Sequence, residues 1–343
     1  MRATEPARVR IALIYNVLHA GGCEMRMAEI AKVLRDRGDE VWLLGSGVTP
    51  EGEVALYEHV GIPREGWVLT SDAQCQPFME WILPTLRDLR PDVADVQWNC
   101  QIPKDLGVPT VVTAHGDVPM PAKGEYNWQA FIQVETFESE YYARDLCPIY
   151  AEVWNWVDLD RFHFSADRGD GVAFFGRLFK TPNLRTVWER YDGRIHVYGM
   201  KYPEDNFPWP PNAEWRGFTD PAKVMADYAV IFGGARVALE GLATGRAVIA
   251  GYPWPGWVPW GDLVTRSNIA DMAARQFVGR YRDDGTMDAP TAEHVWGALQ
   301  CALVQRDLPA SSRELRSWVE EHHEMRKQVA KIREVYEKAI ASA

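Results

Sequence analysis

The sequence is poor in cysteine, and the cysteines it has do not form a recognisable site. Five cysteines are scattered over 343 residues, and no two of them have the spacing of a C-x-x-C motif. An odd number of scattered cysteines is unsuited to a disulfide framework or a zinc site. We therefore expect no metal centre and a reducing, cytoplasmic setting.

Long apolar runs are missing as well. No stretch reaches the roughly 18 apolar residues that a membrane-spanning helix needs, so we expect no integral membrane segment. Residues 1–8 lead directly into a short apolar run without the long apolar core of a signal peptide. We therefore expect no secretion signal.

Basic charge is also in short supply. The chain has 37 Lys and Arg residues against 48 Asp and Glu residues, which gives a formal net charge of −11 and a pI of about 5.3. Binding a polyanion requires a basic surface, so the composition disfavours a nucleic-acid partner, although a local basic patch stays open. The length exceeds that of a usual single domain and predicts two domains, each with its own core.

What is present in the first half is a repeated order of strand, loop, helix and strand. Residues 10–15 and 41–44 are apolar runs typical of strands, and apolar residues recur at helical spacing over 27–34. This β–α–β order predicts a parallel sheet. Gly21 and Gly22 precede the helix and would let the backbone approach a ligand. They do not form G-x-G-x-x-G, which disfavours a nicotinamide cofactor.

The strand predicted over residues 109–115 ends in a possible functional residue. His115 closes this apolar run and is followed by Gly116 and Asp117. Open α/β sheets bind ligands at the carboxyl ends of their strands. We therefore predict a functional role for His115 rather than a purely structural one.

The second half contains the stretch that we consider most informative. Residues 229–232 read as a buried strand, Gly233 and Gly234 as a turn, and residues 247–250 as the next strand. The short helix between them carries Glu240 and closes at Gly245. The first turn of such a helix favours anions. On these residues alone, Glu240 is equally compatible with a ligand site and with an exposed helix face.

Aromatic residues gather in one segment of the second half. The chain has 15 tryptophans, and residues 251–261 place Trp254 and Trp257 among prolines, which excludes a helix interior or central strand. Both loop packing and an aromatic wall facing a ligand remain open.

Six segments in order along the chain carry a family resemblance. They are residues 21–24, 91–95, 111–116, 155–162, 174–178 and 239–250. Together they resemble the motifs of nucleotide-sugar glycosyltransferases of the GT-B fold, particularly the retaining family-four type. The resemblance implies an α/β protein with two Rossmann-like parallel-sheet domains facing a central cleft.

The same resemblance implies a division of the chain. Residues 1–164 would form an N-terminal Rossmann-like domain that binds the acceptor, and residues 165–310 a Rossmann-like domain that binds the nucleotide-sugar donor. Residues 311–343 would form a C-terminal helix that packs back across the domains toward the first one. A Ser311-x-x-Glu314 capping box marks the predicted start of this helix.

The implied activity is metal-independent, retaining transfer of a hexosyl or pentosyl group from a nucleoside-diphosphate sugar, without a tightly bound cofactor. His115 matches a residue near the reacting sugar, and Glu240 matches the acid that holds the ribose hydroxyls. Arg177 and Lys180 would stabilise the departing diphosphate. The other expected donor-binding residues are Gly21, Gly22, Gly176, Gly199, Gly234, Arg236 and Val237. Asp117, Trp254 and Trp257 are expected at the acceptor or the sugar.

Three positions depart from the family pattern. Phe232 stands where the family has the first acid of a pair, Lys180 follows Arg177 by only three residues, and Gln97 replaces a usual histidine. A sugar-nucleotide epimerase and an inactive relative that binds nucleotide or carbohydrate are therefore alternative interpretations. The acceptor stays open among a glycan, a lipid, a natural product and a modified nucleic-acid base, and the sequence does not predict an oligomeric state.

Overall fold

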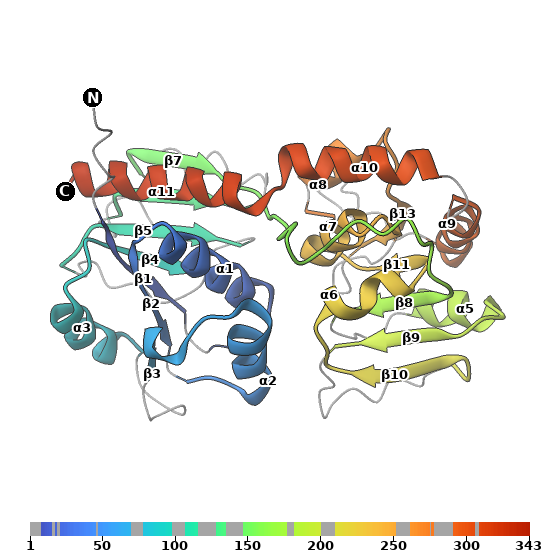
Figure 1. The fold of residues 1–343 in the computed structure, drawn as a ribbon, viewed down its shortest axis with the longest axis horizontal. Coiled ribbons are helices and arrows are strands. Elements are labelled where there is room, and N and C mark those ends of the chain that lie inside the picture. The colour runs from blue at the N-terminus through green and yellow to red at the C-terminus, as the bar shows by residue number, and fades with distance from the viewer. Residues whose placement is uncertain are drawn as a thin grey trace. The chain divides into compact units, whose positions relative to one another are not determined.

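The computed structural model describes residues 8–15, 18, 21–45, 47–69, 78–97, 107–115, 128–134, 147–176, 182–199, 210–251, 261–274, 276–277, 291–305 and 309–343. The chain divides into two compact units (Figure 1). Unit 1 consists of Met1–Trp154 together with Arg326–Ala343, and unit 2 of Asn155–Met325. Each unit contains one mostly parallel sheet with helices packed against it.

The sheet of unit 1 has the strand order β3-β2-β1-β4-β5-β6-β7, and every neighbouring pair is parallel. Its strands are β1 (Arg10–Ile14), β2 (Glu40–Gly45), β3 (Trp67–Leu69), β4 (Val93–Gln97), β5 (Thr110–Ala114), β6 (Ala130–Gln133) and β7 (Ile149–Glu152). All residues of β4, β5 and β6 are buried, as expected for parallel strands covered on both faces. The strand order reverses between β1 and β4.

Helices cover both faces of this sheet. The main ones are α1 (Gly22–Asp36), α3 (Phe78–Leu89) and α11 (Met325–Ala341), and the short α2 (Pro50–Glu53) continues into a π-helical segment, Val54–Val60. Helix α3 packs Ile82 and Leu86 against Ala94 and Val96 of β4. Asp95 lies between those two strand residues and points to the opposite face, where Tyr336 of α11 donates a hydrogen bond to it.

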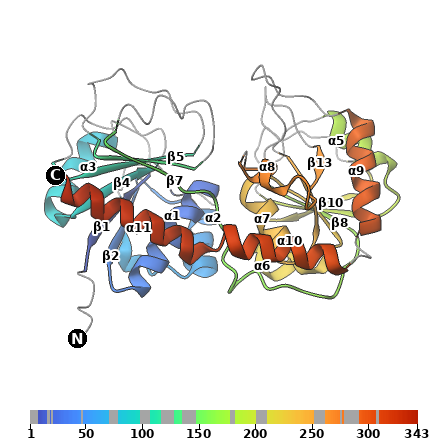
Figure 2. The same cartoon turned by 90° about the horizontal axis from the view of Figure 1, so that it is seen from above.

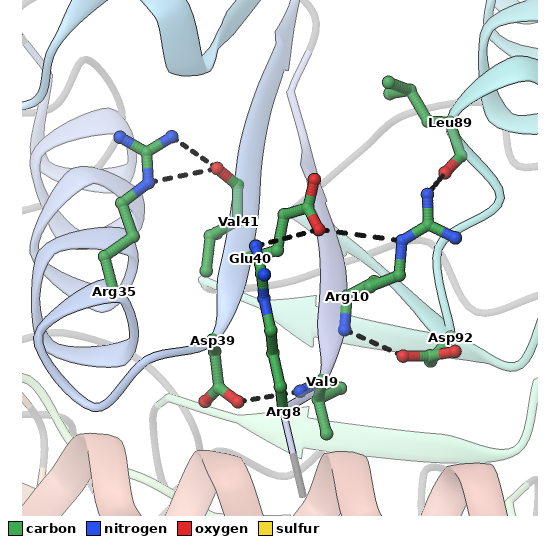
Figure 3. A network of polar contacts seen from close by, with 9 residues as sticks. All are labelled: Arg8, Val9, Arg10, Arg35, Asp39, Glu40, Val41, Leu89 and Asp92. Atoms are coloured by element: carbon green, nitrogen blue, oxygen red, sulfur yellow. Dashed lines mark hydrogen bonds and ion pairs between the residues drawn. The ribbon is translucent and has the colours of Figure 1, made fainter.

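Polar contacts tie the amino-terminal edge of the sheet together (Figure 3). The carboxylate of Asp39 accepts a hydrogen bond from the backbone N–H of Val9 at 2.9 Å, and that of Asp92 accepts one from Arg10 at 2.8 Å. Asp39 also forms a buried ion pair with Arg333 of α11, with Nε and Oδ2 2.9 Å apart. This pair anchors the last helix to unit 1.

The sheet of unit 2 has the order β10-β9-β8-β11-β12-β13, in which only the pairing of β12 with β13 is antiparallel among these strands. The strands are β8 (Val172–Phe175), β9 (Ile195–Tyr198), β10 (Ala213–Gly217), β11 (Val230–Phe232), β12 (Ala247–Ala250) and β13 (Asp262–Leu263). The helices are α5 (Pro182–Arg190), α6 (Pro221–Val224), α7 (Ala235–Ala243), α8 (Ile269–Ala274), α9 (Ala292–Gln305) and α10 (Pro309–His322). Helix α10 packs against α7 (Figure 2).

The expected C-terminal helix consists of two helices. Helix α10 ends at His322 in unit 2, and α11 begins at Met325. Between them the chain pairs with Val157, which donates its N–H to the carbonyl of His323 at 2.9 Å and accepts the N–H of Met325 at 3.2 Å. This long-range pairing interrupts the helix, although the local sequence favours its continuation.

Candidate functional site

All parallel strands in the described sheet of unit 2 end at glycine. These residues are Gly176 after β8, Gly199 after β9, Gly217 at the end of β10, Gly233 and Gly234 after β11, and Gly251 after β12. Because the strands are neighbours in the sheet, the glycines form a continuous row at its carboxyl edge, which we call the glycine edge. Gly217 and Gly251 were not among the residues expected from the sequence.

Backbone packing explains the absence of side chains at the centre of this edge. Gly199 has a φ of +144°, and a Cβ atom placed on it would collide with the carbonyl oxygen of Gly176. The two loops are also linked laterally, since Gly176 donates its N–H to Tyr198 at 3.0 Å and Gly199 donates to Gly217 at 3.1 Å. A ligand at this edge would meet peptide groups rather than side chains.

The glycine edge continues into the amino-terminal end of α7. Gly234 is the N-cap residue, no side chain caps the helix, and a Cβ atom at Gly234 would collide with the carbonyl oxygen of Gly251. Ala235, the first helical residue, has a φ of +48°, a conformation that non-glycine residues seldom adopt. An uncapped helix start combined with backbone strain is typical of an anion-binding site.

Glu240 lies one turn beyond Arg236 on α7, and both side chains are buried. Their relative exposures are 6% and 7%, and Nη2 of Arg236 lies 3.5 Å from Oε1 of Glu240. Glu240 is therefore not an exposed surface residue. The adjacent guanidinium favours the ionised carboxylate, which accepts hydrogen bonds from hydroxyl groups. Val237, also expected at the site, donates its N–H to the carbonyl of Gly234 at 3.1 Å.

A strained turn that sequence reasoning missed adjoins this helix start. Gln276 and Phe277 both have left-handed backbones, with φ of +51° and +59°, and the carbonyl oxygen of Phe277 lies 3.3 Å from a Cβ atom placed on Gly234. Asn155 donates to Oε1 of Gln276, whereas Nε2 of Gln276 is buried without a hydrogen-bond partner. No local motif marks this turn, because its neighbours come from distant parts of the chain.

Phe232 does not enter the site. It is fully buried and belongs to a core cluster that includes Phe174, Trp188 and Val197. The position at which the resemblance predicts an acid is thus occupied by a core residue.

The carboxyl edge of the sheet in unit 1 has a different character. Gln97 ends β4, His115 follows β5, Gln133 ends β6 and Glu152 ends β7. Nε2 of His115 lies 2.8 Å from Oε1 of Gln97. Since that oxygen can only accept, Nε2 carries a hydrogen, and in the neutral form of the ring Nδ1 is the basic nitrogen. This strand-end position agrees with the location expected of a functional His115.

Gln133 is a second polar residue that sequence reasoning missed. Its side chain is 1% exposed, and neither of its amide atoms has a hydrogen-bond partner. Buried unpaired amides are costly and rare, so they often mark the place of a ligand. The register pairs Gln133 with Ala114 rather than with His115, which places the two side chains on opposite faces of the sheet.

The start of α1 presents two glycines with different surroundings. Gly21 is the N-cap, and a Cβ atom on it would lie 2.5 Å from Oε2 of Glu24, whose buried carboxylate folds back over the helix start. A Cβ atom on Gly22 would meet no atom within 4 Å. The carboxylate of Glu24 makes this helix start less suited to phosphate than the start of α7.

Several expected site residues cannot be placed. Arg177, Lys180, Asp117, Trp254 and Trp257 lie outside the described residues. Within the described ranges, no group of three or more histidine, cysteine or acidic side chains could hold a metal ion. Among the helices that the structure describes, none combines the length and the apolar character needed to cross a membrane.

Comparisons with known proteins identify the fold. No protein-family model matches the sequence, and no curated protein matches it. A glycosyltransferase from Rickettsia africae is similar with a TM-score of 0.68 at 14% identity, over 98% of this chain and 100% of that one. The Anabaena protein HepE, solved with UDP and glucose, gives 0.66 at 13% identity over 95% and 99%. A spinosyn rhamnosyltransferase bound to thymidine diphosphate gives 0.54 at 13% identity over 94% and 100%.

At these low identities the similarity establishes the architecture, while activity has to be argued from the site. Two mostly parallel sheets in one chain, matched over nearly the full length of both partners, confirm the predicted fold class. The chain has the GT-B fold.

Proposed function

We propose that this protein is a glycosyltransferase that moves a sugar from a nucleoside-diphosphate sugar to an acceptor. The observation that carries the proposal is the glycine edge of unit 2 ending at the uncapped start of α7, with the buried carboxylate of Glu240 in the second turn. This combination suits a ligand that has both an anionic group and vicinal hydroxyl groups. Two similar structures are complexes with UDP and with thymidine diphosphate.

The donor would lie along the glycine edge. Its diphosphate would accept hydrogen bonds from backbone N–H groups at the start of α7, and Glu240 would accept hydrogen bonds from the ribose hydroxyls. Gly176 and Gly199 would allow the nucleotide to approach the backbone, and Arg236 would keep Glu240 ionised. Arg177 and Lys180, which follow β8 in sequence, are proposed to stabilise the charge that develops on the leaving group.

The reaction breaks the bond between C1 of the sugar and the diphosphate oxygen while the acceptor oxygen bonds to C1, and the acceptor hydroxyl gives its proton to the departing diphosphate. We propose that cationic side chains and helix N–H groups stabilise the negative charge that develops on the leaving group, so that no metal ion would be needed. Retention of the anomeric configuration is part of the proposal and is supported by the motif resemblance. NMR of the anomeric linkage in the product would test it directly.

Unit 1 would supply the groups that face the reacting sugar and the acceptor. His115 presents a basic Nδ1 at the carboxyl edge of the sheet, suited to accept a hydrogen bond from a sugar or acceptor hydroxyl. The open position at Gly22 would let the α1 start approach the sugar, with Gly21 beside it. Asp117, Trp254 and Trp257 remain proposed contacts of the acceptor or sugar.

One observation favours a second candidate function. Because Phe232 is a core residue, the acid that the family pattern places there is missing. A relative that binds nucleotide or carbohydrate without turnover would tolerate this loss.

A panel of UDP-sugars and thymidine-diphosphate sugars separates these functions. We expect release of the free nucleotide, by donor hydrolysis or transfer, for at least one donor, together with nucleotide binding in calorimetry. Tight binding without turnover would favour the second candidate, and formation of an epimeric free nucleotide sugar would indicate an epimerase. Failure to bind any nucleotide would overturn the proposed site.

A further inference from the structure

A buried polar chain leads from the last helix to His115. Asp95 and Gln97 are two residues apart in β4, so both side chains point to the same face of the sheet, and both are fully buried. Thr113 is the register partner of Gln97, and Thr113 and His115 point to this face from β5. Helix α11 covers the face, since Tyr336 reaches Asp95.

Each link of this chain has a defined contact. Tyr336 donates its hydroxyl to Oδ2 of Asp95, and Thr113 donates Oγ1–H to Oδ1 at 2.8 Å. The amide of Gln97 lies near enough to Asp95 to lower the pKa of that carboxyl. At its other end, Oε1 of Gln97 lies 2.8 Å from Nε2 of His115.

We propose that Asp95, Gln97 and Tyr336 are positioning residues that fix the tautomer of His115 and thereby make α11 part of the active site. The inference rests on the proposed function for the role of His115 in turnover, but the tautomer itself does not depend on it. Asp95 and Gln97 are fully buried polar residues of a central strand, and this linkage explains their burial.

The mechanism of the relay is electrostatic. An ionised Asp95 attracts the NH₂ end of the Gln97 amide, which turns its oxygen toward His115. The amide oxygen then accepts the hydrogen of Nε2, and the lone pair on Nδ1 is directed elsewhere. Protonation of Asp95, or loss of its carboxylate, removes the preference for this amide orientation.

The charge state of Asp95 is finely balanced. Burial raises its pKa to about 6, while hydrogen bonds from Tyr336 and Thr113 and the charge of Arg26 on α1 oppose the rise. The groups that face Asp95 are thus Tyr336 from α11, Arg26 from α1, Thr113 from β5 and Gln97 from its own strand. The relay is expected to hold the Gln97 amide in this orientation above about pH 6, where Asp95 is ionised, and to release it below.

Nitrogen-15 NMR of histidine-labelled protein tests the relay without requiring activity. In the native protein at pH 7.5, the His115 ring is expected to show a protonated Nε2 and a bare Nδ1. In Asp95→Asn and in Gln97→Leu the ring is expected to populate both tautomers. Tyr336→Phe, which keeps the ring and its packing, should produce a smaller shift in the same direction, and it preserves the test if the strand variants fail to fold.

Kinetics add a second readout if the protein turns over a donor. Tyr336→Phe is expected to lower kcat about fivefold and leave KM for the donor unchanged, whereas Tyr57→Phe, at an exposed tyrosine of the same unit, should have wild-type kinetics. An unchanged His115 tautomer in folded Asp95→Asn and Tyr336→Phe would overturn the relay. A native tautomer pattern as expected, without turnover of any donor, would support the relay and reject the proposed function.

Discussion

The carboxyl edges of the two sheets differ in what they present to a ligand. In unit 2 the strands end at glycines, so the edge consists of peptide groups and of the start of α7. In unit 1 the strands end at Gln97, His115, Gln133 and Glu152, whose side chains exchange hydrogen bonds or protons. In the proposed function, unit 2 would bind the donor nucleotide and unit 1 would contribute His115.

The largest expected effect comes from placing a side chain on the glycine edge. Gly199→Ala should destabilise the protein by about 4 kcal/mol or more, because its Cβ atom would collide with the backbone of Gly176. Nucleotide affinity should fall at least 100-fold in whatever protein remains folded. Thermal unfolding and calorimetry measure both quantities.

Gly38→Ala is the matched control, since Gly38 has a φ of +94° but open space around it. It should cost only about 1 kcal/mol from backbone strain. Equal destabilisation by Gly199→Ala and Gly38→Ala would show that the close approach of the Gly176 backbone is not what excludes a side chain at Gly199.

The next effect concerns the titratable edge of unit 1. Asp95 has a pKa of about 6 in the folded protein, above the value near 3.9 of an unfolded aspartate, so the folded state holds this proton more tightly. The free energy of unfolding should therefore fall by about 3 kcal/mol as pH rises from about 3 to 7, with most of the fall between pH 4 and 6. Urea unfolding of wild type and Asp95→Asn should show that the variant lacks this decrease.

Asp36→Asn, at an exposed position of α1, should leave the pH dependence of wild type intact. If the free energies of unfolding of Asp95→Asn and wild type change in parallel between pH 4 and 6, Asp95 does not carry a raised pKa. The two sheets would then not differ by a buried group that titrates in this range.

Removing the imidazole of His115 tests directly whether this residue contributes to turnover rather than to nucleotide binding. His115→Ala should lower kcat by about 100-fold or more, a typical effect of losing a general acid or base, while nucleotide affinity changes less than threefold. Steady-state kinetics and calorimetry separate the two. A loss of affinity comparable to the loss of turnover would place His115 among the binding groups and weaken the comparison.

The smallest expected effect is the loss of one charged acceptor in unit 2. Glu240→Gln keeps the shape of the side chain but should weaken nucleotide binding about tenfold, because an amide oxygen accepts ribose hydroxyls less strongly than a carboxylate. Glu189→Gln, which alters an exposed Arg–Glu pair on α5, is the control and should bind as wild type. Unchanged affinity in Glu240→Gln would move the ribose site elsewhere.

Much of the fold was readable from local patterns. The strand predicted over residues 229–232 is Val230–Phe232, the predicted strand over 247–250 is β12, and Gly245 closes the helix between them with a φ of +79°. Apolar runs bounded by glycine specify such elements without reference to the rest of the chain. The position of His115 directly after β5 was predictable for the same reason, since a strand end is a local feature.

The missed residues depend on contacts that no local pattern encodes. Gln276 meets Asn155 across 121 positions, and Asp95 meets Tyr336 across 241. The interruption between α10 and α11 arises from pairing with Val157, and no sequence pattern near residue 323 predicts it. Gly217 and Gly251 can be recognised as part of the glycine edge only from the strand order, which places them beside Gly199 and Gly234.

The return of α11 to unit 1 has a consequence for how the protein is made. Asp39 and Asp95 leave the ribosome long before Arg333 and Tyr336, their partners in the folded protein. All of unit 2 is synthesised in between, as one uninterrupted segment. Unit 2 can thus complete its fold during translation, whereas Asp39 and Asp95 of unit 1 lack their partners on α11 until that helix emerges. The order of domain completion is therefore the reverse of the order of synthesis.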